Sequence, residues 1–342
     1  MTQVPATGTP AGGRRAFAGF ILAAWAALLP SGCSRAPPSA ASAEGFLLAI
    51  GSRGTSPGKL YKPRALALDA KTRSLFVVDR SGRIQQVDLE GRHLRQWRLP
   101  EYEQGQPVGI AVEKDGSLLV SDSHYHRVLR YSPDGSRIIH SWGSEGTGPG
   151  QFTFGRDVAV DSEGAVYVGD YGGLNDRIQK FSPDGSFLLE WGRPGEAPGE
   201  FQRPQGMAVE RRGAEESILV ADCANHRVQR FTTGGKWLWS FGALGTGPGE
   251  MRFPFSVAVD EGGDIYVCEW GNHRIQRLDP EGRSLGTLGR GGHGEGELYN
   301  PWDIAVGPDG RIYVADCENH RIQVFRREAL LAARHGNAEA SR

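Results

Sequence analysis

The sequence lacks the features that define several common classes of protein. Its charges nearly balance, with 39 Lys and Arg against 40 Asp and Glu for a formal net charge of −1, so it has no basic excess of the kind that nucleic-acid binding requires. Four cysteines in 342 residues are too few for a disulfide framework, so hydrophobic burial must hold the fold together. The sequence contains no nucleophile elbow, Walker loop or dinucleotide-binding fingerprint.

Long apolar runs are also scarce, and the clearest one lies near the N-terminus. Residues 16–29 follow Arg14 and Arg15 and lead through small residues to Cys33, which is the pattern of a secretory signal. These fourteen residues would span about 21 Å as a helix, whereas ~20 residues are needed to cross a bilayer. We therefore predict a signal peptide at residues 1–33 rather than a permanent anchor helix, followed by a flexible tether at residues 34–44 that is rich in Ala, Ser and Pro.

Residues 29–33 resemble the lipobox of bacterial lipoproteins, in which the cysteine receives a diacylglycerol and becomes the new N-terminus. The resemblance implies lipidation of Cys33 and a place in the cell envelope, membrane-anchored and facing outside the cytoplasm. Pro30 departs from the Leu usual in that family, which bears on the efficiency of cleavage. Arg14 and Arg15 also resemble the start of a twin-arginine signal, so both export routes stay open.

From residue 46 onward the chain repeats one phrase, in which a short apolar strand ends in an acidic residue. The six copies are Leu75–Asp79, Leu118–Asp122, Val166–Asp170, Ile218–Asp222, Ile265–Glu269 and Ile312–Asp316. Their acidic positions lie 43, 48, 52, 47 and 47 residues apart, a period typical of propeller blades and longer than that of common helical repeats. Three further short alternating segments accompany each copy, so each copy contains four predicted strands.

Turn signals separate these predicted strands. Asp115-Gly116 and Pro133-Asp134-Gly135 are typical hairpin turns, and Gly-rich segments such as residues 146–150 connect one copy to the next. The last copy lacks a fourth strand, whereas residues 46–51 match the fourth-strand phrase. We therefore predict an all-β, six-bladed β-propeller of four-stranded antiparallel blades at residues 45–326, with the last blade closed by the N-terminal strand.

The repeats resemble those of the NHL family, named for an Asn-His-Leu pattern. That pattern occurs here as Asn225-His226-Arg227, Asn272-His273-Arg274 and Asn319-His320-Arg321. The resemblance covers about residues 46–326 and implies a six-bladed propeller. NHL domains attached to ubiquitin-ligase modules bind proteins and RNA, but this chain lacks the Cys/His zinc framework of a RING. Its balanced charge and predicted export argue against RNA, so we expect no nucleic-acid partner.

The residues that recur in every copy are predicted to be structural. The repeated Asp can accept hydrogen bonds from turn amides, and the Arg that follows five residues later can pair with it. The histidines at 126, 226, 273 and 320 share one repeated position. Equivalent side chains spread around a ring cannot converge on one metal.

Function should instead lie where the copies differ, at two positions near one end of the central channel. The first, after the recurring Pro, holds Arg64, Val108, Arg156, Gln205, Phe255 and Trp302; the second, after the recurring acid, holds Arg80, Ser123, Tyr171, Cys223, Trp270 and Cys317. Arg and aromatic side chains are typical of binding hot spots. We predict that Arg64, Arg80, Arg156, Tyr171, Gln205, Phe255, Trp270 and Trp302 bind a protein, peptide or glycan partner without catalysis and without a cofactor; the alternative is that they only cap the blade ends.

The alternative to a binding module is a metal-dependent enzyme. Peptidylglycine alpha-amidating lyase and gluconolactonase-like hydrolases resemble NHL propellers in blade number and hold zinc or calcium at the channel mouth. Asp157 and Asp303 occupy opposed blades and could share a hard cation, which would make the chain a calcium- or zinc-dependent lyase or hydrolase. His124 is a lone histidine on this face and does not make a zinc site.

Two further segments carry weaker predictions. Cys223 and Cys317 hold equivalent positions two blades apart, too distant for a disulfide, and are predicted with Cys268 to be small, partly buried thiols. Residues 327–342 form a C-terminal tail, whose stretch 328–334 could be a short helix that either caps the channel or hangs free.

Overall fold

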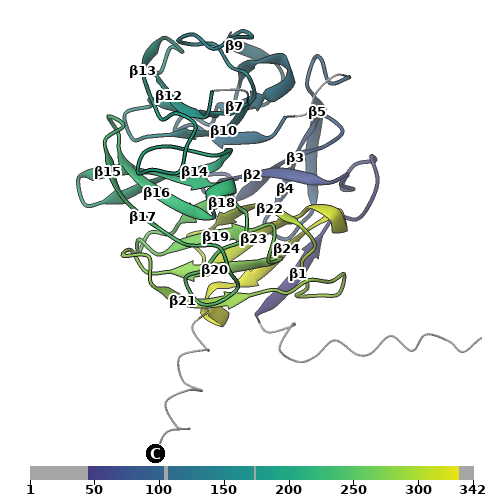
Figure 1. The fold of residues 1–342 in the computed structure, drawn as a ribbon. Coiled ribbons are helices and arrows are strands. Elements are labelled where there is room, and N and C mark those ends of the chain that lie inside the picture. Colours follow the sequence, from purple (N-terminus) through teal and green to yellow (C-terminus); the bar gives the residue numbers. More distant parts are fainter. Residues whose placement is uncertain (1–44, 104–106, 173–174, 331–342) are drawn as a thin grey trace, which may run out of the picture. The chain divides into compact units, whose positions relative to one another are not determined.

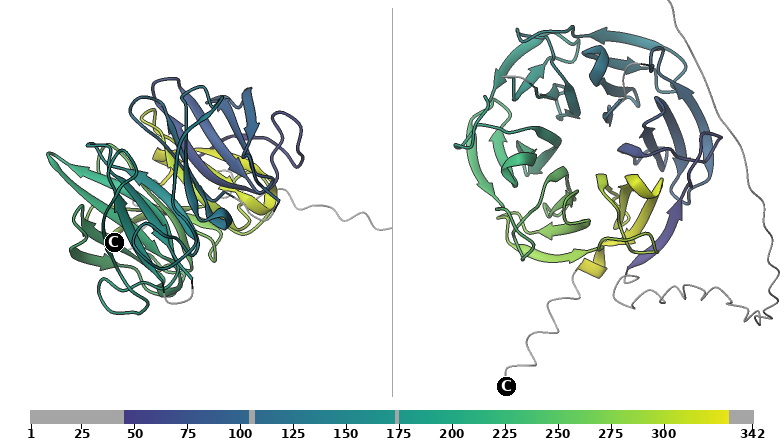
Figure 2. Two further views of the ribbon diagram at one scale, coloured as in Figure 1. Left: turned by 90° about the horizontal axis from the view of Figure 1, so that it is seen from above. Right: turned by 45° about the vertical axis from the view of Figure 1, so that its right-hand side comes forward.

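Six four-stranded antiparallel sheets stand as blades around a common axis in the computed structural model (Figures 1 and 2). The structure describes residues 45–103, 107–172 and 175–330, which all lie in one compact unit. The predicted signal peptide with Cys33, the tether and most of the C-terminal tail lie outside the described residues. Within these residues no helix is both long and apolar enough to cross a membrane.

Each blade runs from an inner strand to an outer strand in chain order, except that the outer strand of blade six is β1. Blades one to three comprise β2 (Pro63–Asp69), β3 (Ser74–Asp79), β4 (Arg83–Asp88) and β5 (His93–Arg98); β6 (Gly109–Val112), β7 (Leu118–Asp122), β8 (Arg127–Tyr131) and β9 (Ile138–Trp142); β10 (Gly155–Val160), β11 (Val166–Asp170), β12 (Arg177–Phe181) and β13 (Phe187–Trp191). Blades four to six comprise β14 (Pro204–Arg212), β15 (Glu215–Asp222), β16 (Arg227–Thr232) and β17 (Trp237–Phe241); β18 (Pro254–Val259), β19 (Ile265–Glu269), β20 (Arg274–Leu278) and β21 (Ser284–Leu288); β22 (Pro301–Val306), β23 (Arg311–Asp316), β24 (Arg321–Arg326) and β1 (Phe46–Ile50). Short 3-10 turns follow four strands: Ser123–Tyr125, Cys223–Asn225, Cys317–Asn319 and Arg327–Leu330.

The hydrophobic core lies between the blades. The second strand of each blade has strands on both sides and neighbouring blades over both faces, which explains why β3, β7, β11, β15 and β19 are buried along their whole length apart from the first residues of β15. The buried apolar residues form six clusters, one at each junction between successive blades. Each sheet therefore covers the apolar face of the next, as the repeat period predicts.

Closure of the ring by the N-terminal strand is confirmed. β1 pairs antiparallel with β24, with Phe46 opposite Phe325 and Ile50 opposite Ile322. The purple β1 thus completes the yellow last blade (Figure 2). Because this pairing joins opposite ends of the propeller sequence, the ring has no open blade at its seam.

The repeated acidic and basic residues have the structural role that was predicted. In blade four, Asp222 accepts hydrogen bonds from the backbone N–H of Gln202 and from Arg227 Nε, at 2.7 and 2.8 Å. The same Arg227 donates to the backbone carbonyls of Glu196, Ala197 and Glu200 at 2.7, 3.0 and 2.9 Å. The equivalent arginines of blades one, three, five and six also bond backbone carbonyls of the connection that enters their own blade. Arg127 of blade two pairs with Asp122 and Glu101 instead.

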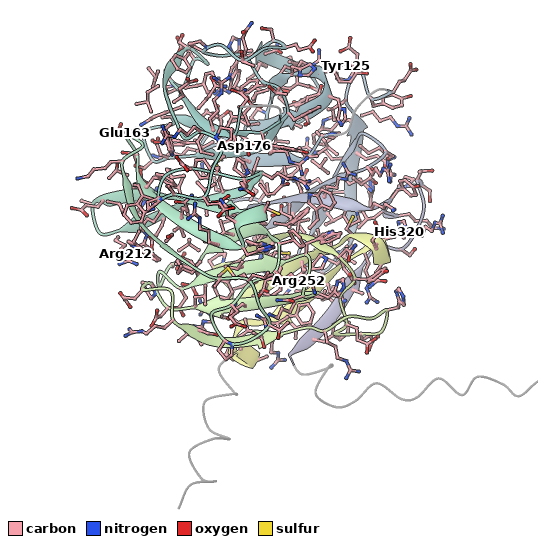
Figure 3. All side chains as sticks on the ribbon, viewed as in Figure 1. Tyr125, Glu163, Asp176, Arg212, Arg252 and His320 are labelled. Carbon is pink, nitrogen blue, oxygen red and sulfur yellow. The ribbon has the colours of Figure 1, made fainter. Side chains whose placement is uncertain are left out.

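The repeated histidines connect neighbouring blades. Nδ1 of His320, labelled in Figure 3, accepts a hydrogen bond at 3.1 Å from the backbone N–H of Lys62, so it joins blade six to blade one. His226 and His273 do the same for Phe253 and Asn300. Burial lowers the pKa of all three rings, which keeps them neutral and able to accept.

The C-terminal end of the described chain contains only the first part of the predicted helix at 328–334. A 3-10 turn covers Arg327–Leu330, and the residues after it lie outside the described part. Leu330 is buried in the cluster between blades five and six, and Arg327 pairs with Asp260 at 3.1 Å. These residues pack against blades five and six and do not line the hollow at the channel mouth described below.

Candidate functional site

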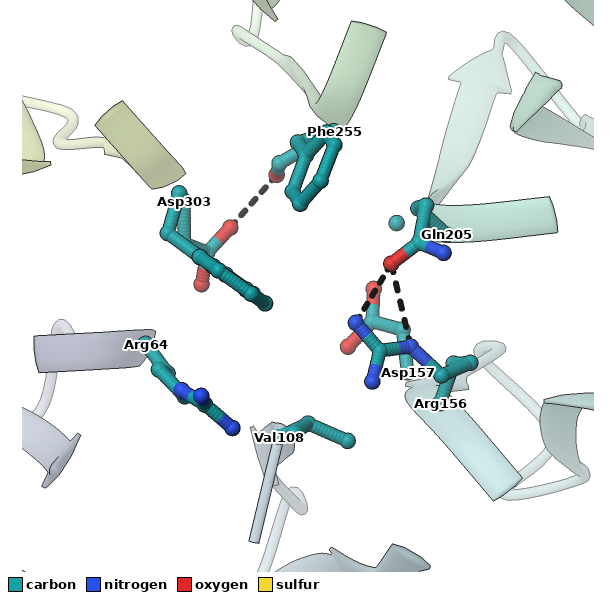
Figure 4. A pocket seen from close by; sticks show the side chains of 10 residues that line it. Arg64, Val108, Arg156, Asp157, Gln205, Phe255 and Asp303 are labelled. Atoms are coloured by element: carbon teal, nitrogen blue, oxygen red, sulfur yellow. Dashed lines mark hydrogen bonds between the residues drawn. The ribbon is translucent and has the colours of Figure 1, made fainter. Parts of the chain in front are cut away.

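All six residues of the first variable position meet around one hollow, which Figure 4 shows from close by. Together they define what we call the channel mouth: Arg64, Val108, Arg156, Gln205, Phe255 and Trp302. Each lies at the start of the innermost strand of its blade, so the propeller symmetry brings them together. The space left between them is about 10 Å³, about enough for one water molecule.

Two arginines share one aromatic side chain at this mouth. The guanidinium carbons of Arg64 and Arg156 lie 4.7 and 5.8 Å from the ring centroid of Trp302, within cation–π range. Arg64 has no hydrogen bond or ion pair with any described residue, and its Nε is buried without a partner. Arg156 donates through Nε and Nη2 to the side-chain oxygen of Gln205, an uncharged acceptor (Figure 4).

Close packing affects the charge of both arginines without removing it. Burial is the main cause that lowers the pKa of Arg64 to about 10; the nearby Cys317 opposes this shift, and the positive charge of Arg156 is a smaller cause in the same direction as burial. Burial also lowers the pKa of Arg156. A guanidinium group stays protonated in proteins, and both side chains are partly exposed. The mouth therefore presents two positive charges with no carboxylate in direct ion-pair contact among the described residues.

Aromatic rings form the opposite wall. Phe255 lies 4.9 Å from Trp302 in an edge-to-face arrangement and stacks on Trp270 at 5.6 Å. Tyr171 lies beneath the guanidinium groups of both Arg156 and Arg203, at 5.4 and 5.5 Å. Aromatic rings therefore lie against both arginines of the mouth.

The second variable position contributes less to the mouth than predicted. Tyr171 and Trp270 support it from outside through the contacts above, whereas Arg80 is exposed and does not line the hollow. The three remaining side chains at this position are buried: Ser123, Cys223 and Cys317. Each of these begins a 3-10 turn, which turns a small side chain inward. The buried thiols of Cys223, Cys268 and Cys317 are free, as predicted.

Asp157 and Asp303 lie side by side with the mouth residues, on blades three and six. Asp157 accepts a hydrogen bond at 2.7 Å from the backbone N–H of Met207 in blade four. Asp303 accepts one at 2.7 Å from the N–H of Leu66 in blade one, and another from the hydroxyl of Ser256 in blade five. The two carboxyl groups therefore make equivalent bonds to the following blade on opposite sides of the axis.

Both carboxyl groups are harder to ionise than usual. Burial raises the pKa of Asp157 to about 8, with the charge of Asp303 as the next cause. Burial raises the pKa of Asp303 to about 6, less than for Asp157, and its bond from Ser256 is the chief opposing effect. At neutral pH the pair thus carries about one negative charge.

Small residues beside the aspartates make this arrangement possible. A Cβ on Gly109 would lie 2.7 Å from the Cα of Asp157, and one on Gly206 would lie 2.6 Å from the Cα of Ser256. The inner strands of adjacent blades therefore approach closely at this level. The sequence analysis missed Gly109, Gly206 and Ser256; the signal that could have found them is that they share one repeat position with the two aspartates.

The structure adds no further ligand to the predicted metal site at Asp157 and Asp303. Among the described residues no group of three or more His, Cys, Asp or Glu side chains could hold a metal ion. His124, predicted on this face, is exposed, and its ring lies 5.7 Å from that of Phe154. Burial lowers the pKa of His124, with Arg64 and Arg156 as further causes, so the histidine is neutral beside a cationic mouth.

Comparison with known proteins supports the fold and the repeat. A model of the NHL repeat matches residues 251–278 and 298–325, which lie in blades five and six. The protein is thus a six-bladed β-propeller that carries NHL repeats. Human "NHL repeat-containing protein 3" is 36% identical over 81 residues, which cover 23% of this chain and 22% of that protein.

Two kinds of named enzyme are also similar to this chain. Rat "Peptidylglycine alpha-amidating monooxygenase" is 36% identical over 89 residues, 25% of this chain but only 9% of that protein. The solved structures of a streptogramin B lyase and of virginiamycin B lyase from Staphylococcus aureus superpose with TM-scores of 0.58 and 0.57. They are 14% and 17% identical, and each match covers 83% of this chain and 98% or 95% of the other. At this identity the likeness shows the shared propeller fold.

Proposed function

We propose that this propeller is a non-catalytic binding module that holds a protein, peptide or glycan partner at the channel mouth. The observation that carries the proposal is the pair Arg64 and Arg156, two cationic side chains on one indole ring without a carboxylate partner. Guanidinium groups without a carboxylate partner, beside partly exposed aromatic rings, favour recognition of an external group. The supporting residues are held by rigid inner strands, so the site needs little ordering when a partner binds.

The proposal is tested by capture of partners from a cell-envelope extract. Replacing Arg156 and Trp302 together with Ala should abolish capture while the melting temperature stays close to that of the parent. The matched control replaces Arg98 and Tyr102, another cation–π pair at 4.8 Å, which belongs to the outer strand of blade one and the loop after it. Retained capture by the mouth variant, or equal loss in the control, would move the binding site elsewhere.

We propose further that the propeller acts in the cell envelope, exported through residues 1–33 and attached by a lipid on Cys33. The support is the apolar run before Cys33 and the lipobox-like residues around it. Cell fractionation tests this: Cys33→Ala should move the protein from the membrane fraction to the soluble exported fraction. Recovery of both forms in the cytoplasm would contradict export.

A metal-dependent lyase or hydrolase is the second candidate. It is favoured by the opposed carboxyl groups of Asp157 and Asp303, and by fold similarity to propellers that are named as lyases. Against it, most carboxylate oxygens of the pair already accept hydrogen bonds from the protein. Metal analysis, described in the Discussion, separates this candidate from the binding module.

A further inference from the structure

The chemistry of the mouth specifies more than a general binding surface. The buried Nε of Arg64 has no acceptor among the described residues, and Arg156 has only the amide oxygen of Gln205. In a protein interior such donors normally meet an acceptor, and the planar guanidinium fork matches a carboxylate best. The missing partner of this pair is therefore an oxyanion.

The charge of the mouth limits how negative that oxyanion should be. Arg64 and Arg156 contribute two positive charges, and the carboxyl groups of Asp157 and Asp303 line the same hollow. A monoanion can pair with the two guanidinium groups, whereas a dianionic phosphate would bring a second negative charge close to these carboxyl groups.

The size and lining of the hollow describe the rest of the ligand. A space of about 10 Å³ admits one water-sized atom such as a carboxylate oxygen, so the bulk of a ligand must lie outward. There it meets Val108, Trp302 and Phe255, and Trp270 stacks on Phe255. These side chains suit an apolar or aromatic body.

We infer that the channel mouth binds an organic monocarboxylate, with the carboxylate between Arg64 and Arg156 and its apolar body against Phe255 and Trp302. This inference rests on the proposed binding function and names the chemical class that the site recognises. The ligand is a free small molecule or a carboxylate displayed by a larger partner. Both share this head group and compete for the same two arginines.

The test uses purified propeller and three probes: phenylacetate, its neutral amide phenylacetamide, and inorganic phosphate. Titration calorimetry and tryptophan fluorescence should show saturable binding of phenylacetate, with the amide and phosphate at least about tenfold weaker. Arg64→Gln and Arg156→Gln should each weaken phenylacetate binding about tenfold or more, while Arg98→Gln on the outer strand leaves it unchanged. Equal binding of the amide, tighter binding of phosphate, or equal loss in Arg98→Gln would overturn the inference.

The two proposals fail in distinguishable ways. If the Arg156→Ala, Trp302→Ala variant loses partner capture but phenylacetate does not bind the parent protein, the carboxylate class is wrong and the binding face stands. If that variant keeps its partners but phenylacetate binds through Arg64 and Arg156, the mouth is a small-molecule site and the partner-capture proposal is wrong. Folding of each variant is checked by its melting temperature, so loss of binding is read only from folded protein.

Discussion

Asp303 accepts a hydrogen bond from the backbone N–H of Leu66, 2.7 Å away in space and 237 residues earlier in the chain. This bond joins the last blade to the first beside the channel. At the outer edge of the ring, β1 closes the same junction. Asp157 makes the equivalent bond to Met207 from blade three to blade four. The two aspartates therefore stabilise the ring at opposite junctions and also set the charge of the mouth.

Removing these carboxyl groups should cost unequal amounts of stability. Asp303→Ala leaves the N–H groups of Leu66 and Ile304 and the hydroxyl of Ser256 without their acceptor. Asp157→Ala frees the N–H groups of Met207 and Val158, and no hydroxyl. Each buried donor left unpaired costs about 1–3 kcal/mol, so Asp303→Ala should lower the free energy of unfolding by about 1–3 kcal/mol more than Asp157→Ala. Urea denaturation of both variants measures the difference, and equal losses would contradict the role of Ser256.

Deleting residues 45–51 should destabilise the propeller strongly. The deletion removes β1, exposes the edge of β24, and uncovers Phe325 and Ile322, which pair with Phe46 and Ile50. The lost burial of about three apolar side chains is worth roughly 5 kcal/mol, which corresponds to a fall in melting temperature of about 10 °C or more. A scanning calorimetry trace measures this fall.

The control for that deletion removes the same number of residues at 34–40 from the predicted tether. Because these residues belong to the predicted tether and to none of the blade strands, the melting temperature should not change. A deletion of 45–51 that melts like the tether deletion would mean that strand closure contributes little to stability.

Stability should fall as the pH rises toward 9, with Asp157 as a cause. Its pKa is about 8 in the folded protein against an ordinary value of 3.8, so between these values the folded chain holds a proton that the unfolded chain has lost. The stabilisation is complete below the unfolded pKa and is lost as the pH rises through about 8. Melting temperatures of the parent should therefore drop between pH 6 and pH 9, and Asp157→Asn should reduce that drop.

Asp134 provides the control for this pH dependence. It lies in an exposed turn, where hydrogen bonds from Ser132 and Ser136 lower its pKa, so it is fully ionised throughout this range. Asp134→Asn should leave the slope of melting temperature against pH unchanged. A parent-like slope in Asp157→Asn would show that Asp157 ionises normally.

The sequence was enough to predict the blades, because six copies of one strand phrase at a blade-like spacing have few other solutions. It also placed Arg64, Arg156 and Trp302 together, since equivalent positions in a closed ring must converge on the axis. The direction of side chains at the second position could not be predicted. That direction depends on whether a 3-10 turn follows, as at Cys223, or not, as at Trp270.

The bonds of Asp157 and Asp303 to the next blade were equally out of reach. They depend on how closely the inner strands approach, which Gly109 and Gly206 permit. Distances between blades follow from packing across the whole ring, and no local pattern encodes them. The sequence therefore suggested a metal site at a place where backbone amides take up most of the carboxylate oxygens.

The repeated arginine should be intolerant of substitution by lysine. Arg227 bonds one carboxylate and three backbone carbonyls at once, and a lysine amine cannot reach this set from one position. Arg227→Lys should lower the free energy of unfolding by about 2–3 kcal/mol. Arg283→Lys is the control, because Arg283 is 75% exposed and pairs with Asp279 at the surface, where such pairs contribute little to stability. Similar losses of stability in the two variants would contradict the structural role of Arg227.

Metal analysis should find no stoichiometric calcium or zinc in the purified protein. Asp303 uses both oxygens for the N–H groups of Leu66 and Ile304 and the hydroxyl of Ser256, and Asp157 uses one for Met207. A calcium ion needs six to eight oxygen ligands, and a catalytic zinc needs three protein ligands. Plasma mass spectrometry of the parent and of a double variant with Asn at 157 and 303 should give the same low content. Stoichiometric metal in the parent that is lost in the double variant would support the metal-dependent enzyme and contradict the proposed binding module.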